Sequence, residues 1–257
     1  MEIPRPPLER PRALVLDADQ TVVFPDFSNN APGRIVAAVR KLDAVGVPVT
    51  FCTGRLPHAA IGLFEGMGIT IPLSADYGNT LVSPEGNVLW HASMDPDVAG
   101  QISKRLTEHT GITPRYEYTS YTSPEEIKTS PLQNIIGIKM KTESGMEKNL
   151  ADIAKEFDLP FFSRDIRGST EFTAWPTRLD KGTGLVMLAE IMGVPPEDII
   201  TAGDDRPDIP MFEVSGWGVA VRNARPDVKE SADKIVPGVT NHGVAQLIEK
   251  YIVRRLR

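Results

Sequence analysis

The sequence predicts an α/β fold: a doubly wound parallel sheet into which a second, α+β domain is inserted. Short apolar runs that end at polar residues recur along the chain, with helical patterns between some of them, which is typical of parallel strands joined by crossover helices. The middle of the chain instead combines hairpin-like and helical segments. We therefore expect the core in residues 1–89 and 175–257, and the inserted domain in residues 90–174.

The elements of the core follow from the apolar patterns. Ala13-Leu14-Val15-Leu16 is fully apolar and bounded by prolines and acids, as in a strand buried on both faces. Apolar residues recur at helical spacing from Pro32 to Val45, with Asn30 as a candidate N-cap and Gly46 as the stop. Three further strands and one further helix are predicted at Val47–Cys52, Ile199–Ala202, Trp217–Val221 and Lys181–Met192, the last ended by Gly193.

The elements of the insert follow a different pattern. Just before the insert, a hairpin is predicted from Thr80-Leu81-Val82, a turn at Ser83–Gly86 and a second run at Asn87–Trp90. Within the insert, helices are predicted at Asp95–His109 and Gly145–Phe157, and strand-like segments at Ile135–Met140, Phe161–Phe162 and Thr170–Trp175.

Composition limits the classes of function. The 257 residues contain 34 Asp and Glu against 28 Lys and Arg, so the net charge is −6, which argues against a nucleic-acid partner. No apolar run approaches the roughly 18–20 residues of a membrane span, and the proline-rich start does not resemble a signal peptide. The single cysteine, Cys52, excludes an intrachain disulfide framework. We expect a cytoplasmic protein; its oligomeric state is not indicated by the sequence.

Two carboxylates follow the first predicted strand. That strand runs into Asp17-Ala18-Asp19-Gln20-Thr21, and side chains two apart on an extended backbone lie on the same side. Open α/β sheets bind their ligands at the carboxyl ends of the strands. Because two like charges so close repel each other, a hard, oxygen-seeking ion such as Mg²⁺ is the natural candidate to lie beside them.

Three more groups of polar residues follow later core segments. Thr53-Gly54-Arg55 supplies a hydroxyl and a backbone turn that can hold a phosphate oxygen. Lys181 lies in the first turn of a helix, where a cation opposes the helix dipole, so we expect an anion near it. The run from Gly203 to Asp208 places an acidic cluster at another strand end.

The order of these motifs, D-x-D-x-T, T-G-R, Lys and G-D-x-x-x-D, resembles the haloacid dehalogenase (HAD) superfamily of phosphatases. The likeness covers nearly the whole chain. The segment from Gly203 to Asp233 is similar to the C-terminal half of the Cof-type branch, whose α+β cap is inserted between the second and third motifs. The resemblance implies a Rossmann-like HAD core with residues 90–174 as the cap.

The resemblance also implies roles for individual residues. Asp17 would be the nucleophile that forms an aspartyl-phosphate, and Asp19 the general acid and base. Thr53 and Lys181 would bind the transferring phosphoryl oxygens. The implied Mg²⁺ would be held by Asp17, the Asp19 carbonyl, Asp204 and Asp208.

Several positions leave alternatives open. Gly54, Arg55 and Asn223 are candidate substrate-binding residues, but for Arg55 and Asn223 a role in loop stabilisation is equally favoured. Asp205 is either a loop charge or a further metal ligand. The residues that depart from the Cof pattern are Gln20, Pro207 and Tyr77-Gly78-Asn79. The G-D-D-R-x-D run also resembles that of trehalose phosphate phosphatases.

The favoured function is a Mg²⁺-dependent phosphatase acting on a small phosphorylated metabolite, either a sugar phosphate or a phosphorylated hydroxy acid. A phosphomutase of the same superfamily is the first alternative, although the fourth motif of phosphomannomutases is longer than Gly203–Asp208. A signalling receiver or a catalytically silent binding module is the second, since receivers also place Asp, Thr and Lys at sheet ends; receivers, however, need only about 120 residues and have no cap.

Overall fold

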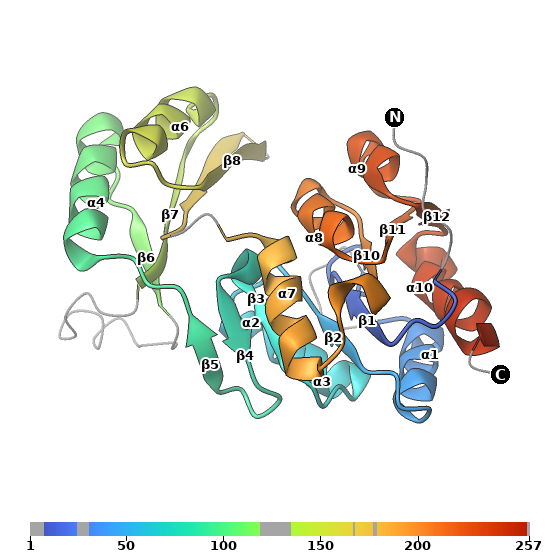
Figure 1. Ribbon diagram of the computed structural model, residues 1–257. Helices are drawn as coiled ribbons and strands as arrows, with labels where there is room; N and C mark the ends of the chain where they lie inside the picture. Colours follow the sequence, from blue (N-terminus) through green and yellow to red (C-terminus); the bar gives the residue numbers. More distant parts are fainter. Residues whose placement is uncertain (1–7, 25–30, 119–134, 167, 177–178, 256–257) are drawn as a thin grey trace. The chain divides into compact units, whose positions relative to one another are not determined.

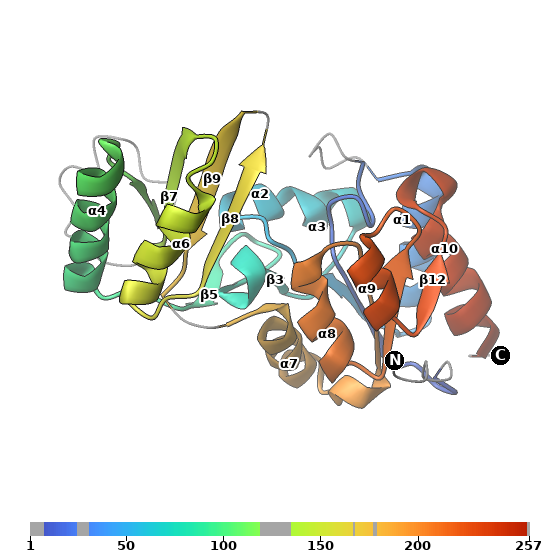
Figure 2. The same cartoon turned by 90° about the horizontal axis from the view of Figure 1, so that it is seen from above.

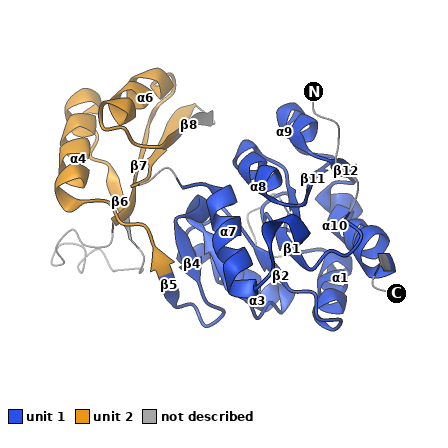
Figure 3. Cartoon of the chain, in the orientation of Figure 1, with its two compact units in different colours: residues 1–89, 179–257 blue, residues 90–178 orange. Residues whose placement is uncertain are grey.

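The chain folds into two compact units. The structure is a computed structural model that describes residues 8–24, 31–118, 135–166, 168–176 and 179–255. Residues 1–89 and 179–257 form one unit, here the core unit, and residues 90–178 form the other, here the inserted unit (Figure 3). Among the described residues, no helix combines the length and the apolar character that crossing a membrane requires.

The core unit is built on a five-stranded sheet in which every neighbouring pair is parallel (Figure 1). Four of the strands are buried along their whole length, because helices cover a parallel sheet on both faces. The order is β12-β11-β10-β1-β2, with β1 at Ala13–Leu16, β2 at Val49–Phe51, β10 at Ile199–Gly203, β11 at Trp217–Val221 and β12 at Lys234–Val236.

The helices of the core unit follow the predicted patterns where these were strong. The helix α7 has the predicted bounds, and Gly193 after it adopts a φ of 62°, the left-handed conformation that ends a helix. The helix α1 is shorter than predicted and begins after Pro32; Asn30 lies outside the described residues. The bounds are α1 Gly33–Asp43, α2 Pro57–Ala60, α3 Gly62–Met67, α7 Lys181–Met192, α8 Ile209–Val214, α9 Pro226–Ser231 and α10 Gly243–Leu247.

The order of the strands reverses between β1 and β10. The chain moves from β1 to β2 in one direction, and from β10 through β11 to β12 in the other. Because crossovers are right-handed, opposite directions place the helices on opposite faces. Helices α1 and α10 pack together on one side, and α7 and α8 pack together on the other (Figure 2). The sheet is therefore doubly wound, as predicted, with its switch point between β1 and β10.

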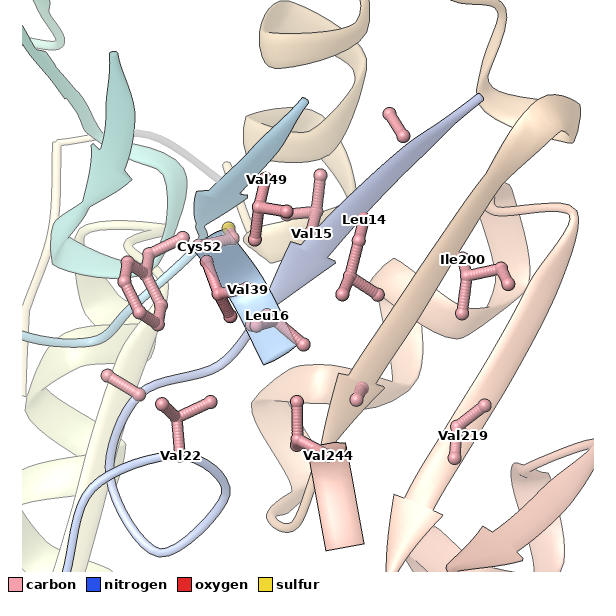
Figure 4. Packing of buried hydrophobic residues seen from close by; sticks show 14 of the residues in the cluster. Leu14, Val15, Leu16, Val22, Val39, Val49, Cys52, Ile200, Val219 and Val244 are labelled. Atoms are coloured by element: carbon pink, nitrogen blue, oxygen red, sulfur yellow. The ribbon is translucent and has the colours of Figure 1, made fainter. Parts of the chain in front are cut away.

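Buried aliphatic side chains hold β1 and its neighbours in place. Leu14, Val15 and Leu16 are fully buried, and residues from the helices and adjoining strands surround them (Figure 4). A second, three-stranded sheet of order β3-β4-β5 follows β2 along the chain, and its strands β4 and β5 are the predicted hairpin strands. Its strands are β3 Leu73–Ala75, β4 Thr80–Val82 and β5 Val88–His91.

The inserted unit has an antiparallel sheet and a hydrophobic core of its own. Strand β9 alternates inward and outward, with Thr170, Phe172 and Ala174 buried, and helices α4 and α6 pack on the sheet. Asp95 caps α4 by accepting hydrogen bonds from two backbone N–H groups. The sheet order is β6-β7-β9-β8, with β6 Arg115–Tyr118, β7 Ile135–Glu143, β8 Phe161–Ile166 and β9 Ser169–Ala174; the helices are α4 Pro96–Thr110 and α6 Glu147–Glu156.

Candidate active site

The predicted acids lie at the switch point of the core sheet. Leu16 at the end of β1 is in register with Ala202 of β10, so Asp17 and Asp204 come directly after the ends of two adjacent parallel strands. The backbone N–H of Asp17 donates to the carbonyl of Ala202 at 2.8 Å. In open α/β sheets this is the position where a crevice forms and ligands bind.

Three buried carboxylates meet at this point. Asp17, Asp204 and Asp208 each offer an oxygen atom, and these three atoms lie within 4.8 Å of one another. We call this set the carboxylate cluster. Its members are almost fully buried, with 6%, 7% and 1% of their surface exposed. Carboxylate oxygens are the ligands that hard divalent cations prefer.

Lys181 enters the carboxylate cluster from the first position of α7. Its Nζ donates to Oδ1 of Asp17 at 2.5 Å and to Oδ1 of Asp208 at 2.6 Å, and the side chain is only 3% exposed. Asp180 caps the helix by accepting from the backbone N–H of Thr183 at 2.9 Å. The anion that the sequence predicts beside this lysine is therefore supplied by the protein's own acids.

Asp208 is held by a tight turn after β10. Its Oδ2 accepts from the backbone N–H groups of Asp204 and Asp205, at 2.8 and 3.0 Å. A Cβ atom on Gly203 would lie 2.4 Å from this carboxylate, so only glycine fits there. Asp205 caps the turn by accepting from the N–H of Arg206 and lies outside the carboxylate cluster. The spacing of the G-D-x-x-x-D motif thus places its first and last acids together and turns Asp205 away from them.

The electrostatics of the cluster favour a further cation. Burial raises the pKa of Asp17 well above its usual value, against the influence of Lys181, and Asp208 and Asp204 raise it further. Burial, together with Asp208, raises the pKa of Asp204 to about 7. Burial alone would lower the pKa of Lys181, but Asp17 and Asp208 raise it well above its ordinary value, so the ammonium stays charged. If all three carboxylates ionise, their charge and that of one ammonium sum to −2, which a divalent cation would neutralise.

The T-G-R segment follows the neighbouring strand β2. Thr53 is buried, and its Oγ1 accepts from the backbone N–H of Arg55 at 3.2 Å. A Cβ atom on Gly54 would lie 2.4 to 2.7 Å from the ring tip of Tyr77, so the glycine makes room for this aromatic ring. Since Leu16 pairs with Phe51, Thr53 follows its strand at the same edge of the sheet as Asp17. Substrate contacts by Thr53 and Gly54 stay predictions.

The side chains of Asp19 and Asn223 each bond to another loop of the core unit. The carboxylate of Asp19 is not part of the carboxylate cluster; it accepts two hydrogen bonds from the guanidinium of Arg55. The expected metal contact of Asp19 is through its carbonyl and stays a prediction. The side-chain amide of Asn223 donates to the carbonyl of Gln20 at 3.0 Å. Gln20 has a φ of 62°, so Asn223 supports a left-handed turn at a position that departs from the Cof pattern.

Thr21 lies in the candidate site, although no role was predicted for it from the sequence. It is fully buried, and its Oγ1 donates to Oδ1 of Asp204 at 3.1 Å. The available signal was its place in D-x-D-x-T, two residues beyond Asp19. The left-handed backbone of Asp76 and Tyr77, with φ of 48° and 56°, had no sequence signal, because tyrosine rarely adopts this conformation.

A comparison with known protein families identifies the family of the chain. A family model described as haloacid dehalogenase-like hydrolase matches residues 14–121 and 113–248. The chain belongs to the haloacid dehalogenase-like hydrolases. The resemblance seen in the sequence, including the Cof-type branch, and the HAD-like fold with a cap domain are confirmed.

Relatives and solved structures are similar over nearly the full chain. A phosphoglycolate phosphatase of Methanothermobacter thermautotrophicus is 26% identical over 94% of this chain and 99% of its own. One of Methanosarcina acetivorans is 26% identical over 93% and 95%. A Geobacillus kaustophilus structure superposes with a TM-score of 0.77 at 22% identity, covering 96% of this chain and 99% of its own. A HAD-like hydrolase from Bacteroides thetaiotaomicron also gives 0.77, at 18% identity, covering 93% and 98%. The family and the names of its relatives support a phosphatase.

Proposed function

We propose that this HAD-like hydrolase is a Mg²⁺-dependent phosphatase that cleaves a small phosphorylated metabolite through an aspartyl-phosphate intermediate. The observation that supports this most is the meeting of Asp17, Lys181, Asp204 and Asp208 at the switch point of the sheet. A buried nucleophilic carboxylate beside a buried ammonium suits the transfer of a doubly charged phosphoryl group.

The first chemical step forms a bond between an oxygen of Asp17 and the phosphorus, and breaks the bond from phosphorus to the ester oxygen. Asp19 donates a proton to that leaving oxygen. In the second step Asp19 takes a proton from water, whose oxygen attacks the phosphorus and releases Asp17 and inorganic phosphate. Lys181 orients Asp17 and, with the hydroxyl of Thr53, stabilises charge on the transferring phosphoryl oxygens.

The donor set of the cluster fits Mg²⁺. The carboxylates of Asp17, Asp204 and Asp208, with the Asp19 carbonyl, would hold the ion with oxygen ligands only. When bound, Mg²⁺ supplies positive charge that neutralises the acids and the phosphoryl oxygens. Thr21 keeps the carboxylate of Asp204 turned toward this position.

The names of the relatives support one substrate class. Two of them are named phosphoglycolate phosphatases, and phosphoglycolate is a phosphorylated hydroxy acid. We therefore place the phosphorylated hydroxy acids ahead of the sugar phosphates as the substrate class of this chain. A cytoplasmic location agrees with the free, buried thiol of Cys52 and stays a prediction.

The test compares the wild-type protein with Asp17→Asn on p-nitrophenyl phosphate and on phosphoglycolate, with Mg²⁺ and with EDTA. We expect phosphate release by the wild-type protein only with Mg²⁺, and none above background by Asp17→Asn. The matched control is Asp205→Asn, which changes a neighbouring acid outside the carboxylate cluster and keeps turnover. An active Asp17→Asn variant would reject the nucleophile. Conversion of a hexose phosphate to its isomer without phosphate release would favour a phosphomutase instead.

A further inference from the structure

The guanidinium of Arg55 donates two hydrogen bonds to the carboxylate of Asp19. The Nε atom of Arg55 donates to Oδ2 of Asp19 at 2.9 Å, and Nη2 donates to Oδ1 at 2.6 Å. This is the two-point geometry in which a planar guanidinium fixes both the distance and the plane of a carboxylate. Both residues belong to the core unit and follow adjacent strands, β1 and β2.

Burial distinguishes this pair from the ion pairs of the surface. The side chain of Arg55 is 9% exposed and that of Asp19 is 21% exposed. Arg34 makes a similar two-point contact with Glu249, but there the side chains are 49% and 37% exposed. Exposed pairs contribute little because water screens them, whereas a part-buried pair such as Asp19 and Arg55 is screened less. The Arg55 contact is therefore suited to holding Asp19 in one orientation.

The backbone of Arg55 is itself fixed on several sides. Its carbonyl accepts from the N–H of Asp76 at 2.8 Å, and its N–H donates to Oγ1 of Thr53 at 3.2 Å. The N–H of Tyr77 donates to the carbonyl of Thr53 at 3.1 Å, and the Tyr77 ring packs on Gly54. Asp76 and Tyr77 adopt left-handed backbone conformations to make these contacts. A strained turn beside a site is typical of a segment that holds functional groups in place.

We propose that Arg55 is a positioning residue that acts on the reaction through Asp19, and that it is not a substrate ligand. This inference rests on the proposed function. Either oxygen of Asp19 can carry the proton for the leaving group while the other stays bound to Arg55, so the guanidinium orients the general acid without giving up a proton itself.

The chemistry of the leaving group distinguishes an Arg55 that orients Asp19 from an Arg55 that contacts the substrate directly. An alkoxide, as released from phosphoglycolate, leaves only with a proton, whereas p-nitrophenolate leaves without one. Misplacing Asp19 should therefore slow the alkyl ester much more than the aryl ester. A misplacement of about 1 Å typically costs roughly 100-fold in rate, and it lowers kcat, whereas loss of uniform substrate binding raises KM.

The experiment is a double-mutant cycle with Mg²⁺ present. Arg55→Ala, Asp19→Asn and the double variant are assayed on both esters, and Arg34→Ala, which removes the exposed two-point contact, is the matched control. We expect Arg55→Ala to lower kcat on phosphoglycolate roughly 100-fold, with a much smaller loss on p-nitrophenyl phosphate. In the Asp19→Asn background the same change should cost less than about 5-fold, because residues that act as a unit are not additive. Arg55→Lys, which keeps the charge and loses the planar fork, should fall between wild type and Arg55→Ala.

Each other outcome overturns the inference. An equal loss from Arg55→Ala with and without Asp19, or a rise in KM at constant kcat, would make Arg55 a substrate ligand. An equal loss of kcat on both esters would mean that Arg55 does not act through proton transfer by Asp19. If Arg55→Ala fails to fold in thermal unfolding, the same criteria apply to Arg55→Lys. A wild-type protein without activity on either ester would overturn the proposed function and this inference with it, whereas an active wild type with equal losses overturns the inference alone.

Discussion

Replacing Asp204 with asparagine should make the metal-free protein more stable at neutral pH. The pKa of Asp204 is raised from 3.8 to about 7 by burial and by Asp208. Each pKa unit is worth about 1.4 kcal/mol, so keeping this carboxylate ionised at pH 8 costs the folded protein about 4 kcal/mol. Asparagine removes the charge, and its amide oxygen can still accept the hydrogen bond from Thr21.

The sign of the pH dependence follows from the same shift. Between about pH 4 and pH 7 the folded protein holds a proton on Asp204 that the unfolded chain has lost. The unfolded state therefore binds fewer protons in this window, and the free energy of unfolding falls as the pH rises through it. Mg²⁺ should recover more than half of the loss, since an ion bound only by the folded state stabilises it by about 2.7 kcal/mol at 100 times its Kd.

The assay is thermal unfolding in EDTA from pH 4 to pH 8, repeated with Mg²⁺. In EDTA at pH 8, Asp204→Asn should raise the Tm by roughly 10 °C, because about 4 kcal/mol corresponds to 2–4 °C per kcal/mol in a protein of this size. Its Tm should vary less with pH than that of the wild type and should not respond to Mg²⁺. Asp205→Asn is the control and should leave the Tm unchanged. A lower Tm for Asp204→Asn in EDTA at pH 8 would refute the assigned cost of the buried charge.

Three further predictions concern the frame of the site. Gln20→Gly relieves a φ of 62° and should raise the free energy of unfolding by roughly 0.5–1 kcal/mol in urea titrations; a loss would mean that the side chain supports the turn. Gly78→Ala should cost more than about 3 kcal/mol, since its Cβ would lie 2.1 Å from the Asp180 carbonyl at a φ of 98°, whereas Gly46→Ala, with nothing near, should cost about 1 kcal/mol. Burial raises the pKa of Cys52 to about 12, so a thiol reagent at pH 8 should modify it only in the unfolded protein; fast modification of the native protein would contradict this.

The sequence predicted the parts of the fold that have strong local patterns. The helix α7 has the expected bounds because its apolar spacing and the stop at Gly193 were recognisable; the structure adds the Asp180 cap at its start. The strand β1 was recognisable because a buried parallel strand is continuously apolar. Short elements such as β3 and α8 were not predicted, since three to six residues carry too little periodicity to identify.

The sequence predicts which residues lie in the candidate site better than which of them bond to one another. Asp17, Lys181 and Asp208 are expected at strand and helix ends, and the structure joins them. The partner of Asp19 was not predictable, because Arg55 lies 36 positions away and either a substrate or a loop could have engaged it. Pairings of this kind depend on the register between strands, which no local pattern records.

The pairing of β1 with β10 determines the order in which the protein can assemble during synthesis. Leu14 of β1 lies beside Ile200 of β10, so β1 cannot pair with β10 until nearly 190 further residues have been synthesised. The strands and helices of residues 90–178 contact one another over much shorter separations, and local contacts form faster than distant ones. We expect the inserted unit to be folded while β1 still lacks this neighbour, and the acids of the carboxylate cluster to come together only after β10 and the turn that follows it have emerged.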